Sequence, residues 1–141
     1  MATELISVRQ AVNDASMEIG IRQTPVEQAL GSRDEDVVQM TALLTAVADD
    51  VLLDEHYQDL LGDGHWLVDK NGRFLSRPAA DDDRILFDSR VAITGLKYKF
   101  LQAKGLEYGE QMRDFITRLN KLAVRANNRV LDLDLDAGRV V

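Results

Sequence analysis

The chain has 141 residues, the size of one ordinary domain. Its 17 lysine and arginine residues stand against 24 aspartate and glutamate residues, a formal net charge of −7 that disfavours a general nucleic-acid coat. Cysteine is absent, which excludes disulfides, iron–sulfur clusters, thiolate zinc sites and thiol nucleophiles. The 45% apolar share is typical of a globular protein.

No membrane partner is expected. The first residues lack the basic start and apolar run of a signal peptide, and no run of about 18 apolar residues occurs anywhere. The acidic balance also disfavours an anionic membrane surface.

The first segment reads as a helix, with a threonine, Thr3, as its cap and Gly20 at its end. Its apolar residues repeat at the spacing of one helical face: Leu5, Val8, Val12, Ala15 and Ile19. Next, Thr24, Pro25 and Glu27 form a capping box that predicts a short helix ending at Gly31.

A second capping box, Ser32 and Glu35, predicts a long helix that runs to about Tyr57. Its apolar face comprises Val37, Met40, Leu44, Val47 and Val51. The period then changes, and residues 66–76 read as a β-hairpin with Asn71 and Gly72 at the centre of a tight turn. A polar loop over 78–84 follows the hairpin.

Two helices make up the second half. Asp88 or Ser89 caps the first, which carries Val91, Ala92, Leu96, Phe100 and Ala103 and ends at Gly105. The second runs from about 107 to 127, and its apolar face comprises Tyr108, Met112, Phe115, Leu119, Leu122 and Ala126. The short connection predicts an αα-hairpin.

The C-terminal residues alternate strictly, which is the period of a strand and not of a helix. Three leucines, Leu131, Leu133 and Leu135, interleave with three acids, Asp132, Asp134 and Asp136. The pattern predicts a domain over 1–128, with its hairpin at about 66–76, and an extended arm over 129–141. The expected fold class is therefore mainly α: a bundle of about four helices with an inserted β-hairpin and an extended tail.

No catalytic, metal or cofactor site is expected, and we predict that the chain is not an enzyme. The acids of the tail match the first ligand positions of a calcium loop, but Ala137 replaces the required glycine and the last ligand is missing. His56 and His65 have no zinc spacing. The Asp81–Asp83 run reads as a solvated loop.

Basic residues gather on the last two helices: Lys97, Lys99, Lys104, Arg113, Arg118, Lys121, Arg125 and Arg129. They are interpreted either as solvated helix faces or as an electrostatic docking surface for acidic faces of sister subunits. DNA binding by these residues is the weaker alternative, because no exposed aromatic residues interleave with them.

The order of elements resembles the head-to-tail adaptor proteins of tailed bacteriophages, also called head completion or connector proteins, of the tail tubular protein A type. The resemblance is closest from Leu96-Lys97-Tyr98-Lys99-Phe100, through the turn Ala103-Lys104-Gly105-Leu106-Glu107-Tyr108, to Arg118-Leu119. It implies a structural virion protein, assembled in the host cytoplasm as a homo-oligomeric, typically twelvefold ring beneath the portal protein. Such a ring extends the DNA channel for genome ejection and is the platform for the downstream tail or nozzle protein.

The residues suit this role. The alternating tail suits strand addition to a partner, and acidic walls would let DNA pass without holding it. The residues expected to bind the portal or another partner are Val130, Leu131, Asp132, Leu133, Asp134, Leu135, Asp136 and Arg139. The residues expected at the subunit interface are Lys97, Lys99, Lys104, Arg113, Arg118, Lys121, Arg125, Trp66 and Phe74.

Three alternatives stay open. The first is a small helical protein-binding regulatory module that does not assemble into rings. The second is a carboxylate enzyme with a metal, which is disfavoured because the apolar helix faces carry almost no acids. The third is a helix-turn-helix DNA-binding protein.

Overall fold

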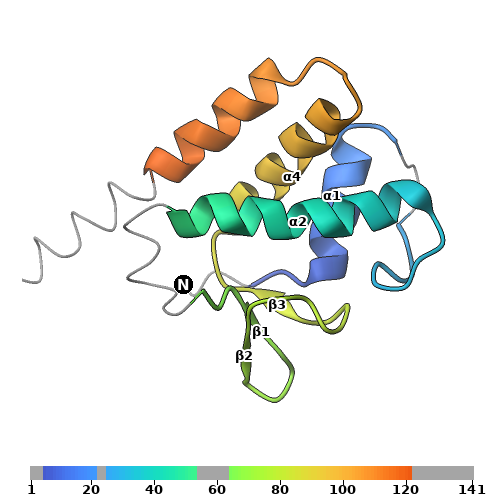
Figure 1. Ribbon diagram of the computed structural model, residues 1–141, viewed down its shortest axis with the longest axis vertical. Coiled ribbons are helices and arrows are strands. Elements are labelled where there is room, and N and C mark those ends of the chain that lie inside the picture. The colour runs from blue at the N-terminus through green and yellow to red at the C-terminus, as the bar shows by residue number, and fades with distance from the viewer. Residues whose placement is uncertain (1–4, 22–24, 54–63, 122–141) are drawn as a thin grey trace, which may run out of the picture.

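The computed structural model describes residues 5–21, 25–53 and 64–121 (Figure 1). Within these residues the helices are α1 (Val8–Glu18), α2 (Glu35–Leu53), α4 (Ser89–Ala103) and a last helical segment, 109–121. A small antiparallel sheet lies between α2 and α4 in the sequence. Some predictions fall on residues outside the described part, namely Thr3, Thr24, His56, Tyr57, Leu122 and Ala126, as do the domain boundary at 128 and the arm.

Helix α4 packs against both α1 and α2, which makes it the central helix of the bundle (Figure 1). The predicted apolar faces supply the core: Val8, Val12, Ala15, Val37, Met40, Leu44, Val47, Val51, Val91, Leu96, Phe100 and Phe115 are all buried. The expected fold class, mainly α with an inserted β-hairpin, is confirmed.

The predicted hairpin is formed by β1 (Leu67–Val68) and β2 (Phe74–Leu75), which pair antiparallel. Its turn differs from the prediction. The backbone N–H of Asp69 donates to the Arg73 carbonyl, and the N–H of Gly72 donates to the Asp69 carbonyl. The loop therefore has three residues, 70–72, and Gly72 (φ +81°) is its last. The Asp69 carboxylate stabilises this longer turn by accepting the N–H groups of Asn71 and Arg73.

A third strand, β3 (Arg84–Ile85), pairs with the other edge of β1 and gives the order β2-β1-β3. The sequence predicted only a polar loop here. The residues just before α1 pair with β3. The N–H of Ile85 donates to the Ile6 carbonyl, and Ser7 forms an isolated antiparallel β-bridge with Arg84. This pairing delays the first helix, whose cap is Ser7 and not Thr3; the Ser7 hydroxyl accepts the Gln10 N–H at 3.1 Å.

The short helix predicted after Pro25 is absent, and residues 25–31 form an irregular loop. Side chains from other parts of the chain form hydrogen bonds with backbone groups of this loop. The amide of Asn13 bonds both the N–H and the carbonyl of Val26, and the carboxylate of Asp81 accepts two further N–H groups of the loop. Tertiary hydrogen bonds therefore outweigh the local capping signal.

Helix α2 begins as predicted but with a different cap. The Asp34 carboxylate accepts the N–H groups of Asp36 and Val37, whereas the Ser32 hydroxyl accepts the N–H of Asp34 itself. Asp34 is therefore the N-cap, one residue before the first helical position.

The predicted αα-hairpin is present. The Asp88 carboxylate caps α4 by accepting the N–H groups of Arg90 and Val91. At the other end the N–H of Leu106 reaches back to the Leu101 carbonyl, a Schellman arrangement that requires the left-handed backbone of Gly105 (φ +71°). The chain then reverses into segment 109–121 (Figure 1).

Candidate functional site

The basic residues of α4 are already paired within the chain. The Lys97 ammonium lies 2.9 Å from the Glu18 carboxylate of α1, and the Lys99 ammonium lies 2.7 Å from Asp50 of α2. Lys104 lies 3.2 Å from Asp36. These pairs fasten α4 to its two neighbours. Lys97 and Lys99 are largely buried in them, whereas Lys104, with 40% of its side chain exposed, stays a candidate interface residue.

Glu18 is the most strongly perturbed of these groups. It accepts both guanidinium N–H groups of Arg90, at 2.9 and 3.0 Å, in addition to the Lys97 ammonium. The bonds from Arg90 and then Lys97 outweigh partial burial and lower the pKa of Glu18 from 4.5 to about 2. Lys97 is only 8% exposed, so Glu18 neutralises a buried cation.

Lys99 contacts Tyr98 in addition to its ion pair with Asp50. Burial alone would lower its pKa, but the bonds to the Asp50 carboxylate and the Tyr98 hydroxyl raise the pKa overall. The ammonium also lies 5.0 Å from the centroid of the Tyr98 ring. The Tyr98 ring in turn packs against Tyr108 and Phe115, which joins this cation to the closing turn of the αα-hairpin.

The remaining predicted interface residues are more exposed. Arg118 pairs with Asp114 one turn away, and Arg113 donates to the Gly109 carbonyl at 3.4 Å. Lys121 is exposed. Arg125, Arg129 and all the predicted partner-binding residues from Val130 to Arg139 lie outside the described residues.

The two aromatic residues assigned to the interface lie in different environments. Trp66 is 1% exposed; its indole N–H donates to the Ser76 carbonyl at 2.7 Å, and its ring packs against Phe87. It is a core residue of this chain, which corrects its assignment. Phe74 on β2 is 62% exposed and stays available for contact.

The aspartate run is structural, not solvated as predicted. Asp83 is 2% exposed and accepts two backbone N–H groups of its own loop, at 2.7 and 2.8 Å. Asp81 accepts the N–H groups of Ala29 and Leu30, at 2.8 and 2.7 Å. Only Asp82 stays exposed, 3.6 Å from Arg9.

We expect Asp81→Asn to lower the free energy of unfolding by about 1–2 kcal/mol, because the amide offers one acceptor where two N–H groups need partners. The matched control is Asp82→Asn, which weakens only an exposed ion pair and should change stability by less than about 0.5 kcal/mol. Urea unfolding of both variants checks this. Equal effects of the two substitutions would show that the Asp81 bonds do not hold the loop.

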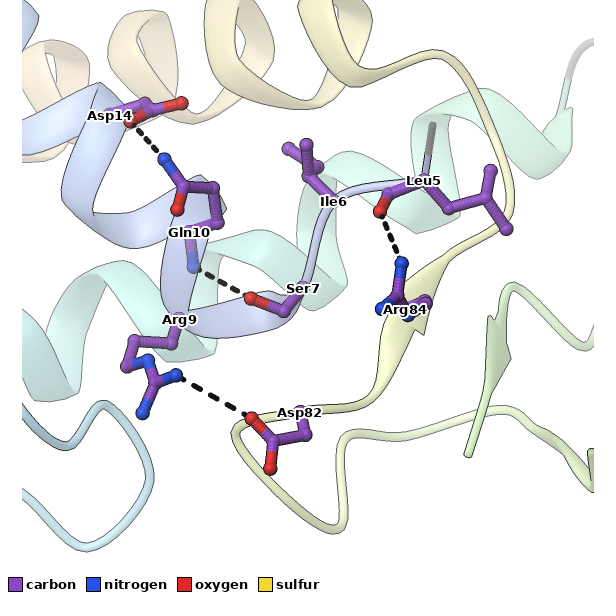
Figure 2. Close-up of a pocket in the computed structure, with 8 residues that line it drawn as sticks. All are labelled: Leu5, Ile6, Ser7, Arg9, Gln10, Asp14, Asp82 and Arg84. Carbon is purple, nitrogen blue, oxygen red and sulfur yellow. Dashed lines mark hydrogen bonds and ion pairs between the residues drawn. The ribbon is translucent and has the colours of Figure 1, made fainter. Parts of the chain in front are cut away.

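Figure 2 shows a cleft of about 510 Å³ where the chain enters α1. It is lined by Leu5, Ile6, Ser7, Arg9, Gln10, Asp14, Asp82 and Arg84. Its polar groups are bonded to one another and to the backbone. Ser7 caps α1, Arg9 faces Asp82, and Arg84 donates to the Leu5 carbonyl at 3.1 Å. These contacts tie the first residues to β3 and give the cleft a structural role.

A second hollow, of about 520 Å³, runs along the outer face of α2. We call it the α2 groove, and its lining residues are Ala29, Leu30, Gly31, Val38, Thr41, Ala42, Thr45, Arg77 and Pro78. Val38 is half-exposed there, although it is a large apolar residue. This face was not predicted from the sequence, although its spacing is present there. Val38, Thr41, Ala42 and Thr45 stand at i, i+3, i+4 and i+7, beside the face that enters the core.

Within residues 5–21, 25–53 and 64–121, no group of three or more histidine, aspartate or glutamate side chains is placed to hold a metal ion. In that part of the chain no helix combines the length and apolar character needed to cross a membrane. Comparison with protein-family models, curated proteins and solved structures found no match to this chain.

Proposed function

We propose that this chain is a structural virion protein of a tailed bacteriophage, a head-to-tail adaptor that assembles as a ring beneath the portal. The ring would extend the DNA channel and carry the next tail component. The protein acts by assembly, with partners bound through its surfaces.

The observation that carries the proposal is the αα-hairpin. The part of the sequence with the closest resemblance to the adaptors, Leu96 to Leu119, folds as α4, a tight glycine turn and segment 109–121. The aromatic ring of Tyr98 packs against the rings of Tyr108 and Phe115. These contacts hold the two helices together across the turn at Gly105.

Exposed apolar side chains, more than exposed charge, support contacts between unlike surfaces of neighbouring copies. The cations of α4 are neutralised inside the chain, so they leave little basic surface to hold DNA. Large apolar side chains are exposed on several different elements: Met17, Ile21, Val38, Leu53, Phe74, Leu106 and Ile116. Different apolar surfaces on one subunit suit head-to-tail packing, in which one surface meets another on the next copy and closes a ring.

The net charge supports passage of DNA. With a formal charge of −7, a ring of these chains would surround the channel with negative potential. Such a wall repels phosphate and lets the duplex slide, whereas a basic wall would bind it. The DNA contact in this proposal is therefore transient and independent of sequence.

The test is the mass of the full chain with and without portal rings, measured in solution by native mass spectrometry. We expect portal rings to gain about one copy of the chain per portal subunit. A chain lacking residues 130–141 is the comparison, and it should bind portal rings more weakly, because copies that do not hold one another in a ring lose the multivalent attachment. A strict monomer that leaves the mass of the portal ring unchanged would contradict the proposal and favour the monomeric binding module.

A further inference from the structure

The α2 groove is an exposed, partly apolar hollow for which the chain itself can supply an occupant. The groove exposes Val38, with Thr41, Ala42 and Thr45 along the same helical face. We propose that it binds the leucine- and aspartate-alternating C-terminal segment, residues 130–136, of a second copy. This inference rests on the proposed function, because head-to-tail contacts between copies are what it would build.

Length supports this occupant. Four residue steps separate Leu131 from Leu135, which in an extended chain places three leucines along about 13 Å of one face. Along α2, the seven steps from Val38 to Thr45 span about 10 Å. The leucine face therefore matches the apolar length of the groove.

Charge supports it as well. Arg77 lines the groove and is exposed, and it has no ion pair with any residue in the described part of the chain. With leucines directed into the groove, the acids of the alternating segment face its rim, where a guanidinium can bond a carboxylate. The segment carries three such acids, Asp132, Asp134 and Asp136.

The position of the chain end favours a second copy. In Figure 1, segment 109–121 ends on the side of the molecule where α2 ends, whereas the groove lies along the first half of α2. The segment of the same chain would have to cross the molecule to reach its own groove. A neighbour packed head-to-tail brings its own chain end to this surface directly.

The experiment uses two full-length variants with complementary defects. Ala42→Trp fills the groove from an exposed position and leaves the tail intact, whereas Leu133→Asp spoils the tail and leaves the groove intact. Sedimentation velocity should show the wild type self-associating at tens of micromolar, and each variant alone weakened by at least about tenfold. An equimolar mixture should form heterodimers and no larger species, because only one tail and one groove remain functional.

The control is Thr117→Trp, which adds a tryptophan at an exposed position of segment 109–121, away from the groove, and leaves the net charge unchanged. Self-association of this variant should match the wild type, and circular dichroism should show that all variants keep their helices.

Three results would overturn the inference. A wild type that stays monomeric would leave the segment unbound if the mixed variants stay apart, and would place it in its own groove if they associate, because mixing supplies one free tail and one empty groove. Self-association that neither variant weakens would place the contact elsewhere on the chain. Loss of portal attachment by Leu133→Asp, with self-association intact, would give the segment to the portal. Self-association as predicted, without any portal binding, would support this inference while contradicting the proposed function.

Discussion

Replacing Gly95 with alanine is expected to lower the free energy of unfolding by about 1–3 kcal/mol and to loosen segment 109–121 from the bundle. Gly95 lies in the middle of α4, where alanine normally stabilises a helix by up to about 1 kcal/mol. Here a Cβ atom would lie 2.7 Å from Cγ1 of Val47 and 2.8 Å from Cε1 of Phe115. Both distances are too short for carbon atoms, so the overlap outweighs the gain in propensity.

The effect of Gly95→Ala extends to segment 109–121 because Phe115, which the new methyl group would contact, lies in that segment. The Phe115 ring is 4% exposed and packs directly against the backbone of α4 at Gly95, which has no side chain. Val47 is fully buried within α2 and has little room to move, so the ring is the group that must yield. Hydrogen exchange should therefore rise most in residues 109–121, while α1 keeps its protection.

Gly109→Ala is the matched control for this prediction. Gly109 is the first residue of segment 109–121, and an added Cβ would meet only the flexible carboxylate of Glu107, at 3.1 Å. We expect this variant to be as stable as the wild type or slightly more stable. If Gly95→Ala also left stability unchanged in urea unfolding, the close packing of Phe115 on α4 would be wrong.

Replacing Glu18 with glutamine is expected to cost about 2 kcal/mol, the second large effect. Removing one partner of a fully buried ion pair costs about 3–5 kcal/mol, and the figure is lower here because the Glu18 side chain is 34% exposed. The loss leaves the 8%-exposed Lys97 without its carboxylate and frees the Arg90 guanidinium. Urea unfolding at neutral pH measures the effect, because urea is uncharged and does not screen the ion pair.

A second substitution identifies the cause. Lys97→Met keeps an apolar stem in the same buried position and removes the cation. In the double variant, glutamine no longer leaves the buried Lys97 ammonium unpaired, and only the solvent-exposed Arg90 has lost its carboxylate, so the double variant should be more stable than Glu18→Gln alone. Strict additivity of the two single effects would contradict direct coupling between Glu18 and Lys97.

The pH dependence follows from the same group. The folded-state pKa of Glu18 is lowered to about 2 from 4.5, so its contribution is complete above about pH 4.5 and is lost as the pH falls toward 2. The wild type should therefore lose more stability than Glu18→Gln between pH 4.5 and pH 2. Thermal unfolding across this range tests the sign, and parallel curves for the two proteins would contradict it.

Most of the helical bundle could be predicted from the sequence because apolar spacing reports directly on which face is buried. The cap of α4 at Asp88 and the turn at Gly105 were also predictable, since both depend on neighbouring residues alone. The loop over 25–31 was not, because its hydrogen bonds come from Asn13 and from Asp81, more than 50 residues away for Ala29 and Leu30.

The candidate surfaces were harder to predict for a similar reason. A list of lysines on two helices gives their charge but not their partners, and the acids that neutralise Lys97 and Lys99 lie on α1 and α2. Trp66 was predicted at the subunit interface, but its ring packs against Phe87 and only 1% of the residue is exposed. The α2 groove depends on Arg77 and Pro78 lying opposite Val38, a juxtaposition that only the tertiary fold creates.

A reconstruction of the portal vertex of the assembled particle tests the central claim most directly. We predict a ring of density directly beneath the portal, with one four-helix unit per subunit and a three-stranded sheet beside the helices of each unit. Purified particles that lack this chain, or that carry it anywhere other than the junction of head and tail, would contradict a head-to-tail adaptor.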